Sequence, residues 1–288
     1  MYDYPLYRPP SEGNSLIIQA TLGCSHNKCS FCSMYKSKSF VIKSLEQIKK
    51  EIDYFRQVYS YVEKIFLADG DALIIPMNDL KEILLYIKEV FPECIRVTLY
   101  GTPKSIMIKS IEELQELKKL GLYMIYMGIE SGDDVVLLDI NKGVNSKELV
   151  KAAQKVKESK ILLSVTVISG IGGKEYSKNH AINTGKIISE IEPDYLGVLT
   201  LMLEKETHLY NKILNNEFKI LEDIEVLDEI KLFLENIRVH KPAVFRCNHA
   251  SNYISLKGTL PLDKERLLNE IIYYKSTSDL KKEEYRQL

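Results

Sequence analysis

Residues 15–22, Ser15-Leu-Ile-Ile-Gln-Ala-Thr-Leu22, lead into Cys24-Ser-His-Asn-Lys-Cys29-Ser-Phe-Cys32, and these two stretches determine the fold expected for the chain. The apolar run predicts a first β-strand. The C-x4-C-x2-C loop after it folds back tightly enough to aim three sulfurs at one region, as metal or iron–sulfur ligation requires. We therefore expect a metal-cluster site where the first strand ends.

Other uses of three neighbouring cysteines fit this chain less well. The five cysteines are an odd count and the N-terminus shows no export signal, which disfavours a disulfide framework. A zinc site with His26 as fourth ligand lacks a second ligand knuckle. A plant-type 2Fe–2S site lacks its fourth cysteine, because Cys94 and Cys247 lie far along the chain and are expected to be packed or idle thiols. A cubane cluster held by three thiolates instead leaves one iron open for a ligand.

The loop resembles the radical S-adenosylmethionine (SAM) superfamily, in which an aromatic residue such as Phe31 often precedes the last cysteine. The commonest spacing there is C-x3-C-x2-C, so this loop is one residue longer. The resemblance implies that Cys24, Cys29 and Cys32 hold a 4Fe–4S cluster. It also implies that Phe31 packs near the adenine of SAM.

Strand and helix signals alternate after the first strand. Helices are expected to start at Ser44 and Ser110, each with a capping box. Further helices are expected to start near Asn78 and at Ser146, and another helix is expected over residues 181–191. Strands are expected at residues 64–68, 95–100, 124–129, 162–168 and 195–203. Six βα repeats predict an α/β fold with parallel strands, a partial (β/α)6 TIM-like barrel whose functional residues lie at the carboxyl ends of the strands.

The chain is expected to have three parts. Residues 1–14 form an extended N-terminal arm, and residues 15–205 form the barrel core. Residues 206–288 form a C-terminal helical and covering extension, with a helix over 222–238 and a polar segment over 245–253.

Composition limits the partners and the compartment. Lys plus Arg number 39 against 40 Asp plus Glu, so the charge is nearly balanced and nucleic acid is not a favoured partner. The stretch 161–173, which has no charged residue, is shorter than the about 20 residues of a membrane span. We therefore expect no membrane association and a cytoplasmic location.

Two further strand ends resemble parts of a SAM site. After the second strand, Ala68-Asp-Gly-Asp-Ala72 resembles the superfamily's Gly-Gly-Glu-like motif, in which Gly70 and Asp71 would receive the SAM ammonium. Asp-Gly-Asp is also a common turn. After the fourth strand, Gly128-Ile-Glu-Ser-Gly132 resembles the ribose-binding stretch, with Glu130 and Ser131 as contacts. The alternative is that Glu130 caps a helix over 133–138.

After the fifth strand, Ile168-Ser-Gly-Ile-Gly-Gly173 resembles the segment over which the adenine lies, with Ser169 and Gly170 as contacts. Glycine lets the backbone approach a flat ring, although plain strand-to-helix turns use it as well.

The resemblance also implies an activity. Reduced cluster and SAM would give methionine and a 5′-deoxyadenosyl radical, which abstracts hydrogen from a small-molecule substrate, and an electron donor such as flavodoxin or ferredoxin would be needed. Within the superfamily, residues 8–13, 67–73 and 245–253 resemble compact single-domain enzymes, above all queuine lyases, which cut queuine to 7-aminomethyl-7-deazaguanine. The chain is thus expected to be a lyase that serves queuosine salvage.

A 7-deazaguanine base needs polar side chains that accept and donate hydrogen bonds. The candidates are Asp69, Glu204, Asn248, His249 and Asn252. For His249 the alternative is an ordinary loop residue with satisfied hydrogen bonds. Two other functions remain open: a radical SAM enzyme that modifies tRNA or other RNA, and a non-catalytic metal-binding interaction protein.

Overall fold

The computed structural model describes residues 2–286, and its main sheet has eight strands in the order β1-β4-β5-β6-β7-β8-β9-β10. Parallel pairs join β1 to β4, β4 to β5, β5 to β6, β7 to β8 and β8 to β9, whereas β10 is antiparallel to β9. The strands are β1 (Leu16–Gln19), β4 (Lys64–Ala68), β5 (Arg96–Tyr100), β6 (Leu122–Glu130), β7 (Leu162–Ser169), β8 (Tyr195–Thr200), β9 (Ala243–Cys247) and β10 (Leu256–Leu260). The predicted α/β class with a mostly parallel sheet is confirmed.

The described residues form two compact units, each made of separate stretches of chain. The first unit contains residues 2–27, 34–127 and 152–163, and the second contains residues 28–33, 128–151 and 164–286. The expected division into an arm, a core and an extension stays a prediction.

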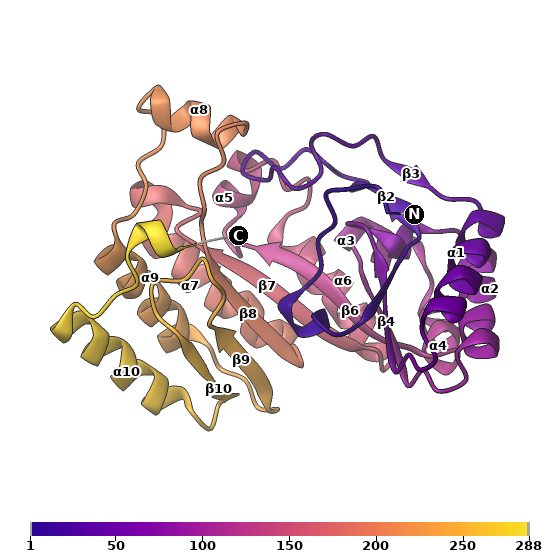
Figure 1. Ribbon diagram of the computed structural model, residues 1–288. Helices are drawn as coiled ribbons and strands as arrows, with labels where there is room; N and C mark the ends of the chain where they lie inside the picture. The colour runs from indigo at the N-terminus through magenta and orange to yellow at the C-terminus, as the bar shows by residue number, and fades with distance from the viewer. Residues whose placement is uncertain (1, 287–288) are drawn as a thin grey trace. The chain divides into compact units, whose positions relative to one another are not determined.

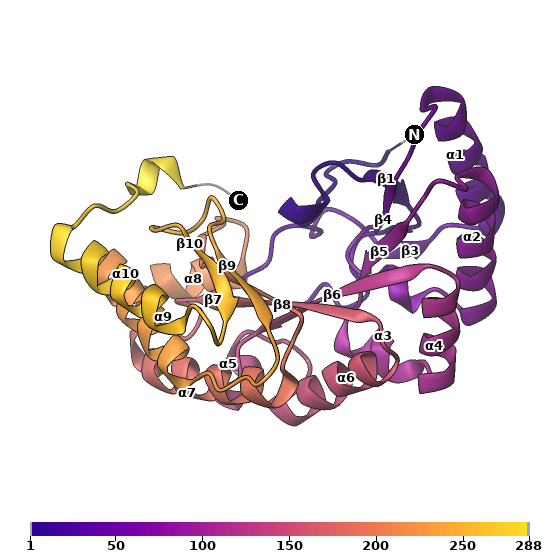
Figure 2. The same cartoon turned by 90° about the horizontal axis from the view of Figure 1, so that it is seen from below.

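In the first unit, helices cover one side of the strands. The helices α1 (Leu45–Val58), α2 (Met77–Val90) and α4 (Ile111–Lys119) lie beside β4 (Figure 1) and β5 (Figure 2), and α3 (Pro103–Ile108) precedes α4. The capping boxes predicted at Ser44 and Ser110 are both present. The apolar stripe of α1 buries Ile48 and Ile52 almost completely, so helix and strand share one core.

The first strand is interrupted at Ala20. Its second part, β2 (Thr21–Leu22), leaves the main sheet and pairs antiparallel with β3 (Val41–Ile42). The residues before β1 include a short 3-10 turn, Pro10–Glu12. Glu12 anchors this turn, because its buried carboxylate accepts a hydrogen bond from Tyr126 Oη at 2.5 Å and pairs with Arg96 Nη2 at 3.2 Å.

In the second unit, α7 (Gly173–Ile191) and α9 (Asp223–Asn236) pack on each other beside β8 and β9 (Figure 2). Gly185 makes this close packing possible, because a Cβ there would lie 3.0 Å from Phe233 O and 2.8 Å from Asn236 Cβ. The other helices are α5 (Asp134–Asp139), α8 (His208–Leu214) and α10 (Lys264–Thr277). Helix α6 (Ser146–Glu158) has residues in both units.

Several element boundaries differ from the sequence prediction. Helix α7 begins at Gly173 rather than near residue 181, and β8 ends at Thr200 rather than 203. The predicted cap Ser146 is wrong by one residue, since Asn145 Oδ1 accepts from Glu148 N at 3.0 Å. The polar segment 245–253 was expected only to cover the sheet, but its first residues belong to β9, which pairs with both β8 and β10.

No helix within residues 2–286 combines the length and apolar character needed to cross a bilayer.

Candidate active site

The end of β4 lies directly against the cysteine loop. A Cβ on Gly70 would lie 2.8 Å from Tyr35 Cε2 and 3.0 Å from Cys24 Cβ. Gly70 N also donates to Gly23 O at 3.0 Å. Position 70 therefore requires glycine for close approach of the loop, which explains the glycine of the Asp-Gly-Asp sequence.

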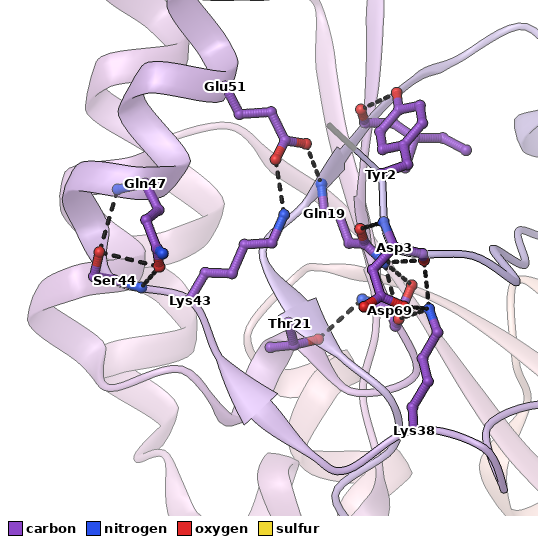
Figure 3. A network of polar contacts seen from close by, with 11 residues as sticks. Tyr2, Asp3, Gln19, Thr21, Lys38, Lys43, Ser44, Gln47, Glu51 and Asp69 are labelled. Atoms are coloured by element: carbon purple, nitrogen blue, oxygen red, sulfur yellow. Dashed lines mark hydrogen bonds and ion pairs between the residues drawn. The ribbon is translucent and has the colours of Figure 1, made fainter.

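Asp69 ties the same loop to the sheet (Figure 3). Its fully buried carboxylate accepts from Gln19 Nε2 at 3.1 Å and from Gly23 N at 3.0 Å, and it pairs with Lys38 Nζ at 3.0 Å. Lys38 in turn bonds the backbone oxygen of Asp3 at 2.6 Å. The partners of Asp69 thus come from residues before Cys24 and from Lys38 after it. Both carboxylate oxygens are engaged by the protein itself.

Asp71 is a buried carboxylate that faces the cysteine loop. It accepts from Ser25 Oγ at 2.5 Å, from Thr102 Oγ1 at 2.9 Å and from Thr102 N at 3.2 Å. Burial raises the pKa of Asp71, while these hydrogen bonds act in the opposite direction. The charge of Lys109 acts on Asp71, although Lys109 Nζ donates its hydrogen bond to Ile75 O at 2.8 Å. An ammonium ion from a ligand would stabilise the charge of Asp71 further.

The three motif cysteines are divided between the units. Cys24 belongs to the first, and Cys29 and Cys32 belong to the second, where Cys32 N donates to Cys29 O at 3.4 Å. The backbone of Ser30 anchors this turn through Ile140 O and Leu209 N, each at 2.9 Å. All three cysteines are partly exposed, and none forms a disulfide.

The residues of this loop fit an iron–sulfur cluster by their chemistry. Three thiols outside any disulfide can serve as soft ligands, and the buried Ser30 Oγ has no hydrogen-bond partner among the described residues. Within residues 2–286, no three His, Cys, Asp or Glu side chains gather as ligands of one metal ion. That result concerns the ligands of one metal ion, whereas a 4Fe–4S cluster held by Cys24, Cys29 and Cys32 would give each thiolate its own iron.

In the second unit, Glu130 ends β6 with a left-handed backbone, at φ 63°. Its Oε1 pairs with Lys142 Nζ at 2.8 Å, and the side chain folds back over Gly128, where a Cβ would lie 2.1 Å from Oε1. The alternative role of Glu130 as a helix cap is wrong, because Asp133 caps α5 by accepting from Val135 N at 3.0 Å.

Two buried side chains, His180 and Glu229, form hydrogen bonds with Ser131, Ser169 and Gly170. Ser131 Oγ lies 2.8 Å from His180 Nδ1. Glu229 Oε1 accepts from Ser169 Oγ at 2.8 Å and from Gly170 N at 2.6 Å. His180 and Glu229 are not among the site residues predicted from the sequence, although a charged residue on the apolar face of α9, beside Val226 and Ile230, is a usable signal.

The C-terminal candidates have different surroundings. Asn252 is buried, and its amide is used within the fold, accepting from Thr200 Oγ1 and donating to Val198 O, each at 2.9 Å. His249 Nδ1 accepts from Ser251 N at 3.1 Å, which places the ring proton of the neutral form on Nε2. Burial lowers the pKa of His249. Asn248 is exposed, and Glu204 is half-buried after β8.

The two remaining cysteines are poorly suited as ligands. Burial raises the pKa of Cys94 to about 11 and that of Cys247 to about 12. Both thiols therefore stay protonated at neutral pH, whereas metal ligation requires thiolates.

Residues 18–184 match the model of the radical SAM superfamily, and the chain belongs to this superfamily. It is 25% identical over 230 residues to an uncharacterized protein of Methanocaldococcus jannaschii, which covers 76% of this chain and 70% of that protein. It is 20% identical to the heme chaperone HemW of Buchnera aphidicola subsp. Acyrthosiphon pisum, covering 78% of this chain and 62% of HemW.

Among solved structures, the radical SAM methyltransferase TsrM from Kitasatospora setae, with cobalamin and a 4Fe–4S cluster bound, superposes with a TM-score of 0.58 at 17% identity. The match covers 71% of this chain and 40% of TsrM, and it shows a shared fold. The cofactors of this superfamily are a 4Fe–4S cluster and SAM.

Proposed function

We propose that this protein is a radical SAM enzyme that acts on a small molecule. The observation that carries the proposal is the contact between the cysteine loop and the Asp69-Gly70-Asp71 turn, where Gly70 lies against Cys24 and Asp71 bonds Ser25. This turn joins the expected cluster ligands to the expected SAM contacts. Such a coupling is what an enzyme needs if SAM is to bind at the open iron.

In this proposal Cys24, Cys29 and Cys32 hold the cluster. When bound, the reduced cluster and SAM supply a 5′-deoxyadenosyl radical that takes hydrogen from the substrate. Asp71 would bind the SAM ammonium, whose positive charge would offset the burial that raises the pKa of this carboxyl group.

The other strand ends would bind the rest of SAM. Glu130 and Ser131 bind the ribose, and Ser169 and Gly170 support the adenine, with Phe31 against its face. Gly170 suits this role because it has no side chain that would keep the backbone away from the ring, and its φ of 85° also favours glycine.

The substrate we propose is queuine, with cleavage of its C–N bond. Support comes from His249, whose neutral ring presents Nε2–H as a donor, and from Asn248 and Glu204, which are not fully buried. Asp69 and Asn252 support the site indirectly, by fixing the cysteine loop and the segment after β9. An electron donor such as a flavodoxin or ferredoxin supplies the electron, and the reducing cytoplasm suits such a cluster.

The relatives favour a second candidate. A ribosomal protein uS12 methylthiotransferase of Pelodictyon phaeoclathratiforme is 24% identical over 183 residues, which is 60% of this chain and 41% of that protein. A related modification of a macromolecule is therefore the alternative to a small-molecule reaction. Salt-dependent tRNA binding would favour an RNA substrate.

The activity is tested with anaerobically reconstituted protein, dithionite and SAM. We expect 5′-deoxyadenosine from wild-type protein and from Cys94→Ala, and at least a 100-fold lower yield from Cys29→Ala. Equal yields from Cys29→Ala and wild type would overturn the radical SAM proposal. With queuine added, the absence of 7-aminomethyl-7-deazaguanine would remove the lyase assignment while leaving the SAM chemistry in place.

A further inference from the structure

A buried polar network in the second unit lies behind the strand ends assigned to SAM. Its central residues are His180 on α7 and Glu229 on α9, and each side chain is at most 4% exposed. Neither residue has a place in the chemistry proposed so far. A buried carboxylate costs free energy unless several donors satisfy it, so the donors to Glu229 indicate what it holds.

The donors to Glu229 come from β7, the turn after it, and α7. Oε1 accepts from Ser169 Oγ and from the backbone N–H of Gly170, at 2.8 and 2.6 Å. Oε2 accepts from Ser177 Oγ at 2.5 Å. Because charge-assisted hydrogen bonds to a carboxylate are among the strongest in proteins, Glu229 fixes the backbone direction at Gly170.

His180 makes the matching connection to the end of β6. Its Nδ1 lies 2.8 Å from Ser131 Oγ and 3.4 Å from Thr184 Oγ1. These hydroxyls accept from Asp133 N at 3.0 Å and from Gly132 N at 2.8 Å, so their own protons are available to Nδ1. If Nδ1 accepts from one of these hydroxyls, a ring proton lies on Nε2, which faces Glu229 Oε1 at 3.7 Å.

The distance between His180 Nε2 and Glu229 Oε1 is too long for a direct hydrogen bond. A cavity of about 10 Å³ lies here, lined among others by His180, Glu229, Ser169 and Thr184. This is about the space that one water molecule needs, and the polar lining supplies its partners. The network can thus run from Ser131 through His180 and Glu229 to Gly170.

We infer that Glu229 and His180 are positioning residues for SAM: together they hold Ser131-Gly132 and Ser169-Gly170 in the conformation that receives the nucleoside. This inference rests on the proposed function, because it takes these two strand ends as the ribose and adenine contacts. Preorganised backbone binds a ligand more tightly, since less ordering accompanies binding. The two side chains act through the strand ends and do not touch the reacting atoms.

Equilibrium dialysis of SAM against reconstituted, unreduced protein tests the inference. We expect the Kd for SAM to rise about tenfold in Glu229→Ala and in His180→Ala. In Glu229→Gln it should rise less than threefold, because the amide oxygen can still accept from Gly170 N. Ser189→Ala is the matched control on α7, since Ser189 Oγ bonds only Gly185 O and Arg238 N in this region, and its Kd should match wild type.

Hydrogen exchange of the protein without SAM gives a readout independent of turnover. In Glu229→Ala, exchange should rise about tenfold at Gly170, with no change in α4 of the first unit. If Glu229→Ala does not fold, the inference is tested with His180→Ala instead, by its Kd for SAM and by hydrogen exchange at Gly132. A folded variant with unchanged SAM affinity and unchanged exchange overturns the inference, whereas loss of 5′-deoxyadenosine formation in wild type would refute the proposed function instead.

Discussion

At the scale of single residues, the structure explains why position 70 is glycine. An Asp-Gly-Asp sequence alone is compatible with any tight turn. The structure places Tyr35 and Cys24 where a side chain on residue 70 would lie. The requirement for glycine therefore comes from the packing of the cysteine loop, not from the turn.

Gly70→Ala should destabilise the protein by about 1–3 kcal/mol, because Tyr35 or Cys24 must move to admit the methyl group. It should also lower the iron bound per chain after reconstitution. Gly197→Ala is the control, since the atoms nearest to its added Cβ lie 3.8 Å away. Urea unfolding and iron analysis measure both effects, and equal behaviour of the two variants would contradict this account.

The ionisation of Asp71 should make the stability of the folded protein depend on pH. Its pKa is raised in the folded protein by burial, so the folded state binds its proton more readily than the unfolded chain. The resulting stabilisation is fully present below the unfolded pKa, about 3.9, and is lost as pH rises through the folded value. Asp71→Asn removes this titration, and its stability relative to wild type should increase between pH 4 and pH 7.5.

Urea unfolding at a series of pH values measures this difference. The same variant should bind SAM more weakly, because the amide does not carry the charge that favours an ammonium ion. A stability difference that is constant with pH would show that Asp71 ionises normally in the folded protein.

At the scale of secondary-structure elements, the sequence predicted helix starts correctly where a nearby side chain accepts a hydrogen bond from the first backbone N–H groups of the helix. Ser44 and Ser110 are predicted caps that the structure confirms, each with the reciprocal contact from Gln47 or Glu113. The start of α7 was missed, because Gly173, Asn179 and His180 are weak helix formers. That helix depends on its packing against α9, which a single segment of sequence does not reveal.

Ser44→Ala tests the contribution of a cap. The hydroxyl accepts from Gln47 N at 3.3 Å, and its loss should cost about 1 kcal/mol, or about 2–4 °C in Tm. Ser39→Ala, at an exposed position outside any helix, should leave Tm within 1 °C, within the range of about 0.5 kcal/mol usual for surface changes. Calorimetry measures both, and an equal Tm for the two variants would mean that the cap contributes nothing.

At the scale of the whole molecule, the order of strands followed from alternating sequence signals, but the last two strands did not. β9 does alternate between buried and open positions, yet it is only five residues long, and Asn248, His249 and Asn252 follow it closely. Its pairing with β8 is a contact between segments about 50 residues apart. Similarly, the cysteines were visible from spacing, whereas Glu229 reaches Gly170 only once α9 is packed.

Ligand linkage provides a prediction for the entire fold. A ligand that binds only the folded state stabilises it by about 2.7 kcal/mol at 100 times its Kd, which for a chain of this size corresponds to about 5–10 °C. SAM should therefore raise the Tm of reconstituted wild type and of Cys94→Ala by this amount. In Cys29→Ala the shift should fall below about 2 °C, because the variant lacks one of the three proposed cluster ligands while the proposed SAM contacts Asp71, Glu130 and Gly170 remain. A full shift in Cys29→Ala would mean that SAM binds without the cluster, and the three cysteines would then need a different role.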